Sequence, residues 1–139
     1  KYPNNPYFRK YLGRCYVSLG DLALYESTWR AILVDYIQGK EGYDEFTARE
    51  ALYYIGYALM SRGEYDMALK YFLKCNDANK LIDKEPTGFQ TNTLLKIGNI
   101  YDIKKRRKDA EGYYKKVLAL KNLSNSHATA EKYLKTPYK

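Results

Sequence analysis

Three copies of one pattern constrain this chain more than any single residue does. A glycine that follows an aliphatic residue recurs at spacings of 43 and 42 residues, as Gly13, Gly56 and Gly98. Sixteen residues after each glycine stands a large aromatic residue, which is Trp29, Phe72 or Tyr114. Because this register holds across two apolar runs of helical spacing in every copy, the sequence predicts three helix hairpins.

The glycines indicate where the two helices of each hairpin cross. A glycine inside a helix costs roughly 1 kcal/mol relative to alanine. That cost is tolerable where a bulky side chain of the neighbouring helix needs the space. Ala68 and Ala110 are the matching small residues of the second helix, whereas the first copy has Tyr25 there. We therefore expect the first hairpin to splay or shift slightly.

Capping and turn residues predict the helix ends. Asn5 is a suitable N-cap, and Pro6 suits the first helical position. Ser126 is expected to cap a last short helix that ends before Pro137. The hairpin turns are predicted at LGD (19–21), RGE (62–64) and KKRRK (104–108).

The pattern resembles the tetratricopeptide repeat, a helix–turn–helix unit of about 34 residues. The resemblance lies in the spacing of four features, namely the aliphatic-Gly-x-x-Tyr motif, the Gly-acid turn, the following Ala and the aromatic residue after it. The resemblance implies one all-α domain, 1–139, built as a right-handed superhelical stack of three antiparallel hairpins with a C-terminal capping helix. Its expected parts are repeats at about 7–38, 45–80 and 88–121 and a capping helix at about 126–135. The long period implies longer second helices or longer loops. HEAT-like and Sel1-like repeats stay open as alternatives.

In this family the first helices line a concave groove that holds an extended peptide or a partner helix. The resemblance therefore implies a non-catalytic protein-interaction or scaffolding module. A groove that is basic at one end and aromatic in the middle favours an acidic peptide with an aromatic or proline anchor. The residues that match groove positions by register are Tyr7, Lys10, Arg14, Tyr53, Tyr57, Asn92, Asn99 and Asp102.

The chaperone-binding members of the family grip a C-terminal carboxylate with a lysine and asparagines. Lys10 matches the first lysine of that set, and Lys96 stands at another basic position. The remaining partners are replaced by Arg14, Tyr54 and Asn92. The carboxylate clamp is incomplete, so we do not expect this chain to bind chaperone tails.

A second interpretation is a structural subunit that assembles head-to-tail with copies of itself. By register, Phe8 and Cys15 stand where later copies contact the preceding repeat, so we expect an adhesive N-terminal end made of Tyr7, Phe8, Tyr11 and Cys15. Another copy would dock its last helix there through Tyr133 and Leu134, and such a contact propagates into a ring or filament. The alternatives are that the Tyr2-Pro3 segment or upstream sequence covers the patch.

The net charge of +8 and the 17 tyrosines favour acidic partners and half-buried interface surface. The basic run at 104–108 is a candidate for binding the phosphates of nucleic acid or of lipid headgroups. A run of this length at a helical turn is more often a solvated face, and no interleaved aromatic residues accompany it. Nucleic acid is therefore not the favoured partner.

Motifs for catalysis, cofactors or metals are missing from the sequence. Cys15 and Cys75 lie far apart and are expected to be buried thiols, and His127 is the only histidine. We expect neither enzyme activity nor a cofactor or metal site. The longest apolar run, 51–60, is too short for a transmembrane segment. A first residue other than Met suits a processed, even exported, product or an excised domain, and leaves the compartment open.

Overall fold

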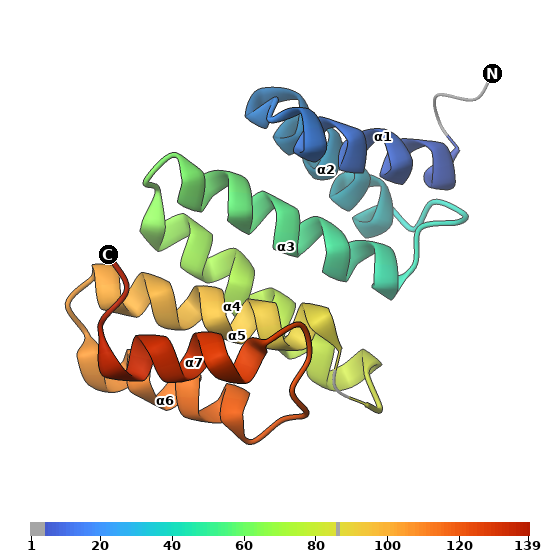
Figure 1. Ribbon diagram of the computed structural model, residues 1–139. Helices are drawn as coiled ribbons and strands as arrows, with labels where there is room; N and C mark the ends of the chain where they lie inside the picture. Colours follow the sequence, from blue (N-terminus) through green and yellow to red (C-terminus); the bar gives the residue numbers. More distant parts are fainter. Residues whose placement is uncertain (1–4, 86) are drawn as a thin grey trace. The chain divides into compact units, whose positions relative to one another are not determined.

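A computed structural model describes residues 5–85 and 87–139, and these residues form an all-α structure without strands. Figure 1 shows α1 beside α2, and α5 beside α6 and α7, as neighbouring helices. The predicted fold class, all-α and built from helix hairpins, is confirmed. The helices are α1 (Pro6–Leu19), α2 (Leu22–Ile37), α3 (Glu45–Ser61), α4 (Tyr65–Ile82), α5 (Gly88–Ile103), α6 (Arg107–Leu118) and α7 (Ser126–Lys135).

The chain divides into two compact units, an N-terminal unit of Lys1–Tyr71 and a C-terminal unit of Phe72–Lys139. In the N-terminal unit α1 packs against α2, and α2 packs against α3. In the C-terminal unit α5 packs against α6, which in turn packs against α7. Each unit thus stacks a helix on the one that precedes it in the sequence, as helix repeats do.

Local sequence accounts for the ends of the first two helices. The side chain of Asn5 accepts the backbone N–H groups of Tyr7 and Phe8 at 2.9 and 3.2 Å. Gly20 ends α1 in the left-handed conformation at φ 73°. Asp21 then caps α2 by accepting a backbone N–H three residues later at 3.0 Å. The Asn5 cap is the one that the sequence predicts, and Gly20 and Asp21 lie in the turn predicted at 19–21.

The cap of α7 differs from the prediction. Ser126 is the first residue of the helix, and its Oγ accepts the N–H of Leu123 at 3.1 Å instead of capping. The amide oxygen of Asn122 takes the capping role by accepting the N–H of His127 at 3.1 Å. The predicted Ser126 cap is therefore wrong, because the loop folds an earlier acceptor over the first turn.

The glycines of α1 and α5 lie where a hairpin partner approaches closely. A Cβ atom at Gly13 would lie 2.7 Å from Nε1 of Trp29, and one at Gly98 would lie 2.5 Å from Cε1 of Tyr114. Both aromatic side chains are fully buried. The predicted helix crossings are confirmed at these two positions, and each aromatic residue fills the space that its glycine leaves.

Candidate functional site

The groove residues predicted for the first two copies lie on α1 and α3 of the N-terminal unit, a region called here the α1–α3 face. The Nζ of Lys10 donates to Oγ1 of Thr47 at 3.3 Å and lies 5.4 Å from the centroid of the Tyr7 ring. Tyr7 is 78% exposed, Tyr57 is 36% exposed, and Tyr53 is half-buried. The face therefore offers one cation and several tyrosine rings.

Arg14 contributes less positive charge to this face than the sequence suggests. Its Nε and Nη2 donate to the two carboxylate oxygens of Glu50 at 2.6 and 2.8 Å. This bidentate bond raises the pKa of the Arg14 guanidinium. Burial, followed by the charge of Glu50, raises the pKa of the neighbouring Tyr54 hydroxyl. The basic character of the α1–α3 face therefore rests on Lys10.

The groove residues predicted for the third copy lie largely inside the C-terminal unit. Asn99 and Asp102 are buried, and the Tyr114 hydroxyl donates to Oδ1 of Asn99 at 3.0 Å and to Oδ2 of Asp102 at 2.8 Å. Burial and the Asp102 bond raise the pKa of Tyr114. Asn92 is exposed. The expectation of a groove surface at Asn99 and Asp102 is corrected, because both side chains bond within the hairpin.

Asp102 links three parts of the C-terminal unit. Nη1 of Arg107 donates to both of its carboxylate oxygens at 3.0 and 3.1 Å, and the backbone N–H of Tyr138 donates to Oδ2 at 3.0 Å. Nη2 of Arg107 donates to the backbone carbonyls of Tyr133 and Leu134 at 2.8 and 2.7 Å. Arg107 thereby caps the end of α7 and ties it to the α5–α6 turn. Sequence reasoning missed this link.

The residues of the predicted adhesive N-terminal end differ in their exposure. Phe8 and Tyr11 are exposed. Cys15 is half-exposed, whereas the sequence predicts a buried thiol. The Tyr2-Pro3 segment proposed as a cover lies outside the described residues. Five residues of α1 line an open cleft of about 570 Å³, namely Tyr11, Arg14, Cys15, Ser18 and Leu19.

The opposite contact surface proposed for self-assembly is less available. Tyr133 and Leu134 of α7 are half-buried and pack on the core of the C-terminal unit. That core consists of Leu94, Leu95, Ala110, Tyr114, Val117 and Ala130. The two α7 side chains therefore serve the fold of their own chain first.

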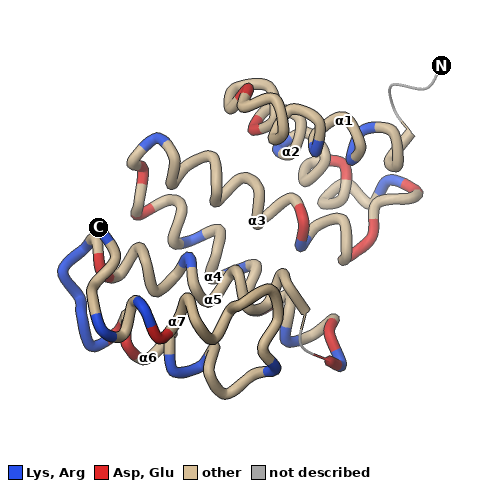
Figure 2. Tube along the Cα trace, in the orientation of Figure 1, with Lys and Arg blue, Asp and Glu red and all other residues tan. Residues whose placement is uncertain are grey.

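Charge is unevenly distributed between the two units. The N-terminal unit has nine Lys and Arg residues and nine Asp and Glu residues, whereas the C-terminal unit has fifteen and seven. The whole net charge of +8 thus belongs to the C-terminal unit. Figure 2 shows basic residues gathered along the α5–α6 turn. Counting charges separately in the two halves of the sequence would have revealed this difference.

Among the described residues, no three His, Cys, Asp or Glu side chains lie together in a way that suits a metal ion. His127 is engaged locally, with its Nε2 2.6 Å from the carbonyl oxygen of Leu120. Within the same part of the chain, no helix combines the length and the apolarity needed to span a membrane.

Helix pairs that stack along the chain, with a glycine of one helix packed under an aromatic residue of the next, define a helical-repeat protein. The tetratricopeptide repeat family model matches residues 50–80 and 91–122. The chain belongs to the tetratricopeptide repeat family. A comparison with curated proteins gives no significant match. Repeats of this family generally mediate protein–protein interactions or scaffolding and are typically non-catalytic.

Proposed function

We propose that this chain is a non-catalytic protein-interaction module that holds an extended peptide or partner helix against the α1–α3 face. The observation that carries the proposal is the pairing of Lys10 with the exposed Tyr7 ring beside α3. Tyrosine rings combine a large contact area with few rotatable bonds, which suits them to recognition. Tyr57 offers a second ring on the same pair of helices.

The same face indicates the chemistry of its ligand. Glu50 neutralises Arg14, so Lys10 is the cation of this face that an acidic group of the ligand would meet. Tyr53 packs edge-on against Tyr54 with ring centroids 5.5 Å apart, so α3 adds aromatic surface to the face, against which an aromatic or proline anchor would pack. We therefore infer a preference for one acidic residue near an apolar anchor.

A selection from a random peptide library on the intact chain tests this proposal. We expect the enriched peptides to carry Asp or Glu near an aromatic residue or proline. Lys10→Gln and Tyr57→Ala should each lower their affinity about tenfold, as the loss of a central contact does. Lys70→Gln, which removes an exposed charge from the same unit, is the matched control. Peptides that bind both variants as tightly as the control would contradict the proposal.

A second candidate function is self-association through α1. The exposed Phe8, with 47% of its surface accessible, and the open cleft beside Tyr11 favour it. Phe8→Glu should abolish assembly in sedimentation velocity. The circular dichroism spectrum of this variant should keep the helical signal of the native chain. Leu24→Glu, at a similarly exposed apolar residue of α2, should leave assembly unchanged. A chain that stays monomeric at high concentration would rule this function out.

A further inference from the structure

The basic run at the α5–α6 turn is part of a larger basic cluster. The two hydrogen bonds from Arg107 to the carbonyls of Tyr133 and Leu134 hold the turn against the end of α7. The N–H of Tyr138 holds the following segment to Asp102. These bonds bring together two sets of lysines and arginines that are separate in the sequence. We define the basic cluster as Lys104, Lys105, Arg106, Lys108, Lys132, Lys135 and Lys139.

Acidic neighbours neutralise only part of this cluster. Arg106 pairs with Asp109 at 2.8 Å, and the carboxylate of Asp102 is buried and already paired with Arg107. Within the part of the chain that the structure describes, Lys105, Lys108 and Lys135 are exposed and form no ion pair. The cluster therefore presents an excess of positive charge to solvent, which attracts polyanions.

Tyrosines of α5 and α6 flank the basic run, contrary to the expectation from sequence, but the faces of these two rings are occupied. Tyr101 and Tyr113 stack on each other with centroids 5.6 Å apart. Arg106 lies 5.1 Å from the Tyr101 centroid, and Lys116 lies 4.4 Å from the Tyr113 centroid. Single-strand binding needs open aromatic faces on which bases stack. Tyr101 and Tyr113 therefore offer no platform for stacked bases, and the remaining aromatic surface at the cluster is a small pocket that suits a side chain of an acidic polypeptide.

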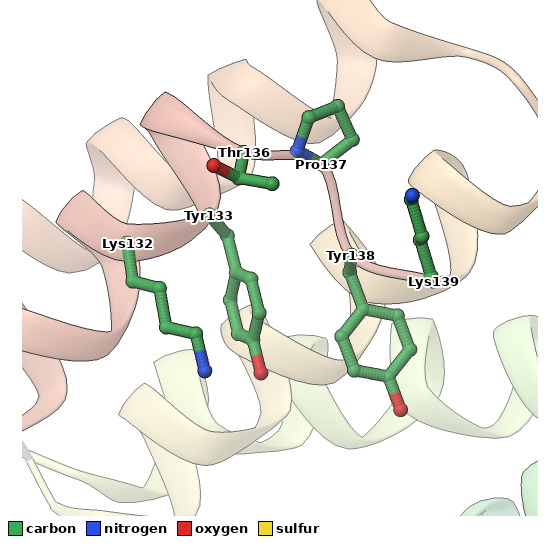
Figure 3. A pocket seen from close by; sticks show the side chains of 6 residues that line it. All are labelled: Lys132, Tyr133, Thr136, Pro137, Tyr138 and Lys139. Carbon is green, nitrogen blue, oxygen red and sulfur yellow. The ribbon is translucent and has the colours of Figure 1, made fainter.

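A pocket of about 290 Å³ adjoins the cluster, lined by Lys132, Tyr133, Thr136, Pro137, Tyr138 and Lys139. Figure 3 shows the rings of Tyr133 and Tyr138 side by side below the bend at Pro137, with their hydroxyls pointing the same way. Their centroids are 5.3 Å apart in an edge-on arrangement. Because the pocket is smaller than most small-molecule sites, it suits a single side chain of a larger partner.

We propose that the basic cluster and this pocket form a binding site for an acidic protein segment. One apolar side chain of the segment enters the pocket and packs against the joined rings of Tyr133 and Tyr138 that form part of its wall. Flanking carboxylates of the segment meet the lysines around the pocket. The site lies within the C-terminal unit, and it is independent of the proposed α1–α3 face. Arg107 is a positioning residue for it, since it holds the turn and α7 together.

Fluorescence anisotropy with the intact chain tests the charge requirement. The probe is a labelled peptide of about twelve residues that alternates Glu and Ser around one central Phe, and its companion carries Ala in place of Phe. We expect the Phe peptide to bind about tenfold more tightly, as one buried aromatic contact allows. The double variant Lys105→Gln with Lys108→Gln should weaken the binding of both peptides. The matched control, Lys80→Gln with Lys84→Gln, should leave the binding of both peptides unchanged. Equal weakening by the two pairs, or no binding of either peptide, overturns the proposal.

A second comparison tests the pocket itself. Tyr138→Ala keeps the N–H that bonds Asp102 but removes the ring, so it should abolish the preference for Phe without changing the affinity for the Ala peptide. Circular dichroism verifies that the variant is folded, and Tyr138→Leu should restore part of the preference by refilling the wall. A preference that survives Tyr138→Ala overturns the assignment. If the chain binds a single-stranded oligonucleotide or phosphatidylserine vesicles more tightly than the Phe peptide, the proposal of an acidic protein segment as the partner is wrong.

Discussion

In the N-terminal unit nine basic residues accompany nine acidic ones, whereas the C-terminal unit carries fifteen basic residues and seven acidic ones. The first unit uses its charges to join helices, as in the pairs Arg14–Glu50 and Arg9–Asp35. The second unit joins its helices through one buried carboxylate, Asp102, and leaves most of its lysines in solvent.

The exposed apolar residues follow the opposite distribution. The N-terminal unit exposes aromatic rings along α1, such as Tyr7 and Tyr11, while the exposed surface around the α5–α6 turn is basic. Both units nevertheless keep the glycine–aromatic crossing of a repeat. The difference teaches that the repeat specifies the core of each hairpin and leaves the solvent-facing positions free to specialise.

The largest expected effect on stability comes from removing the Asp102 carboxylate, which joins the helices of the C-terminal unit. Asp102→Ala leaves Arg107 and the Tyr114 hydroxyl without their shared acceptor, and breaking a buried pair costs about 3–5 kcal/mol. Arg107 is partly exposed, so we expect about 3 kcal/mol, measured by urea unfolding. Asp109→Ala, which breaks the exposed pair with Arg106, is the control and should cost less than about 0.5 kcal/mol. Similar losses in both variants would remove the contrast between the units.

The next effect concerns the feature that both units share. Gly98→Ala forces a Cβ against the Tyr114 ring, which two hydrogen bonds hold in place, so we expect a loss of about 1–3 kcal/mol. Gly112→Ala in α6 meets no atom within 4 Å and should instead stabilise by about 0.5–1 kcal/mol. Thermal unfolding followed by circular dichroism compares the two variants. A neutral Gly98→Ala would mean that the crossing tolerates a shift of the ring.

The features that sequence predicts here are local ones. Asn5 and Asp21 cap helices through bonds to residues two or three positions away, and their side chains are the types that do so. The crossing at Gly98 follows from a period that brings a small and a large residue into register. In both cases the chemistry lies within one hairpin, so the spacing alone specifies it.

The features that sequence misses depend on which residues meet across greater separations. Arg14 and Glu50 are 36 residues apart, as are Asp102 and Tyr138. Helical periodicity predicts the face on which a residue lies, but not which polar group of another hairpin faces it. The same limit applies inside one hairpin, where periodicity places Asp102 on a groove surface although Tyr114 and Arg107 hold its carboxylate inside.

A smaller effect tests the N-terminal unit at the start of α3. The side chain of Asp44 accepts the N–H of Thr47 at 2.9 Å, and this bond lowers the pKa of the carboxyl. Asp44→Ala should cost about 1 kcal/mol, the usual value of an N-cap. Trp29, the only tryptophan and fully buried in this unit, reports unfolding by fluorescence.

The pH dependence gives the control for that prediction. Because the pKa of Asp44 is lower in the folded chain, its contribution is complete above the unfolded value near 3.9 and is lost as the pH falls through the folded pKa. The gap in stability between the native chain and Asp44→Ala should therefore shrink at acidic pH. A gap that stays constant down to a pH of about 2 would contradict the charged cap.

The smallest effect bears most directly on the contrast in charge. Salt screens the ion pairs that join helices in the N-terminal unit, so it should weaken that unit by a few tenths of a kcal/mol, the usual size for partly exposed pairs. Salt also screens the repulsion among Lys104, Lys105 and Lys108, so it should strengthen the C-terminal unit by a similar amount.

Hydrogen exchange at about 0.05 and about 0.5 M sodium chloride measures the local stability of α2 and of α6 in one sample. General salt effects cancel in the difference between the two helices. The pair Lys105→Gln with Lys108→Gln should flatten the response of α6 and leave that of α2 unchanged. Responses of the same sign in both helices would show that net charge does not set the stability of either unit.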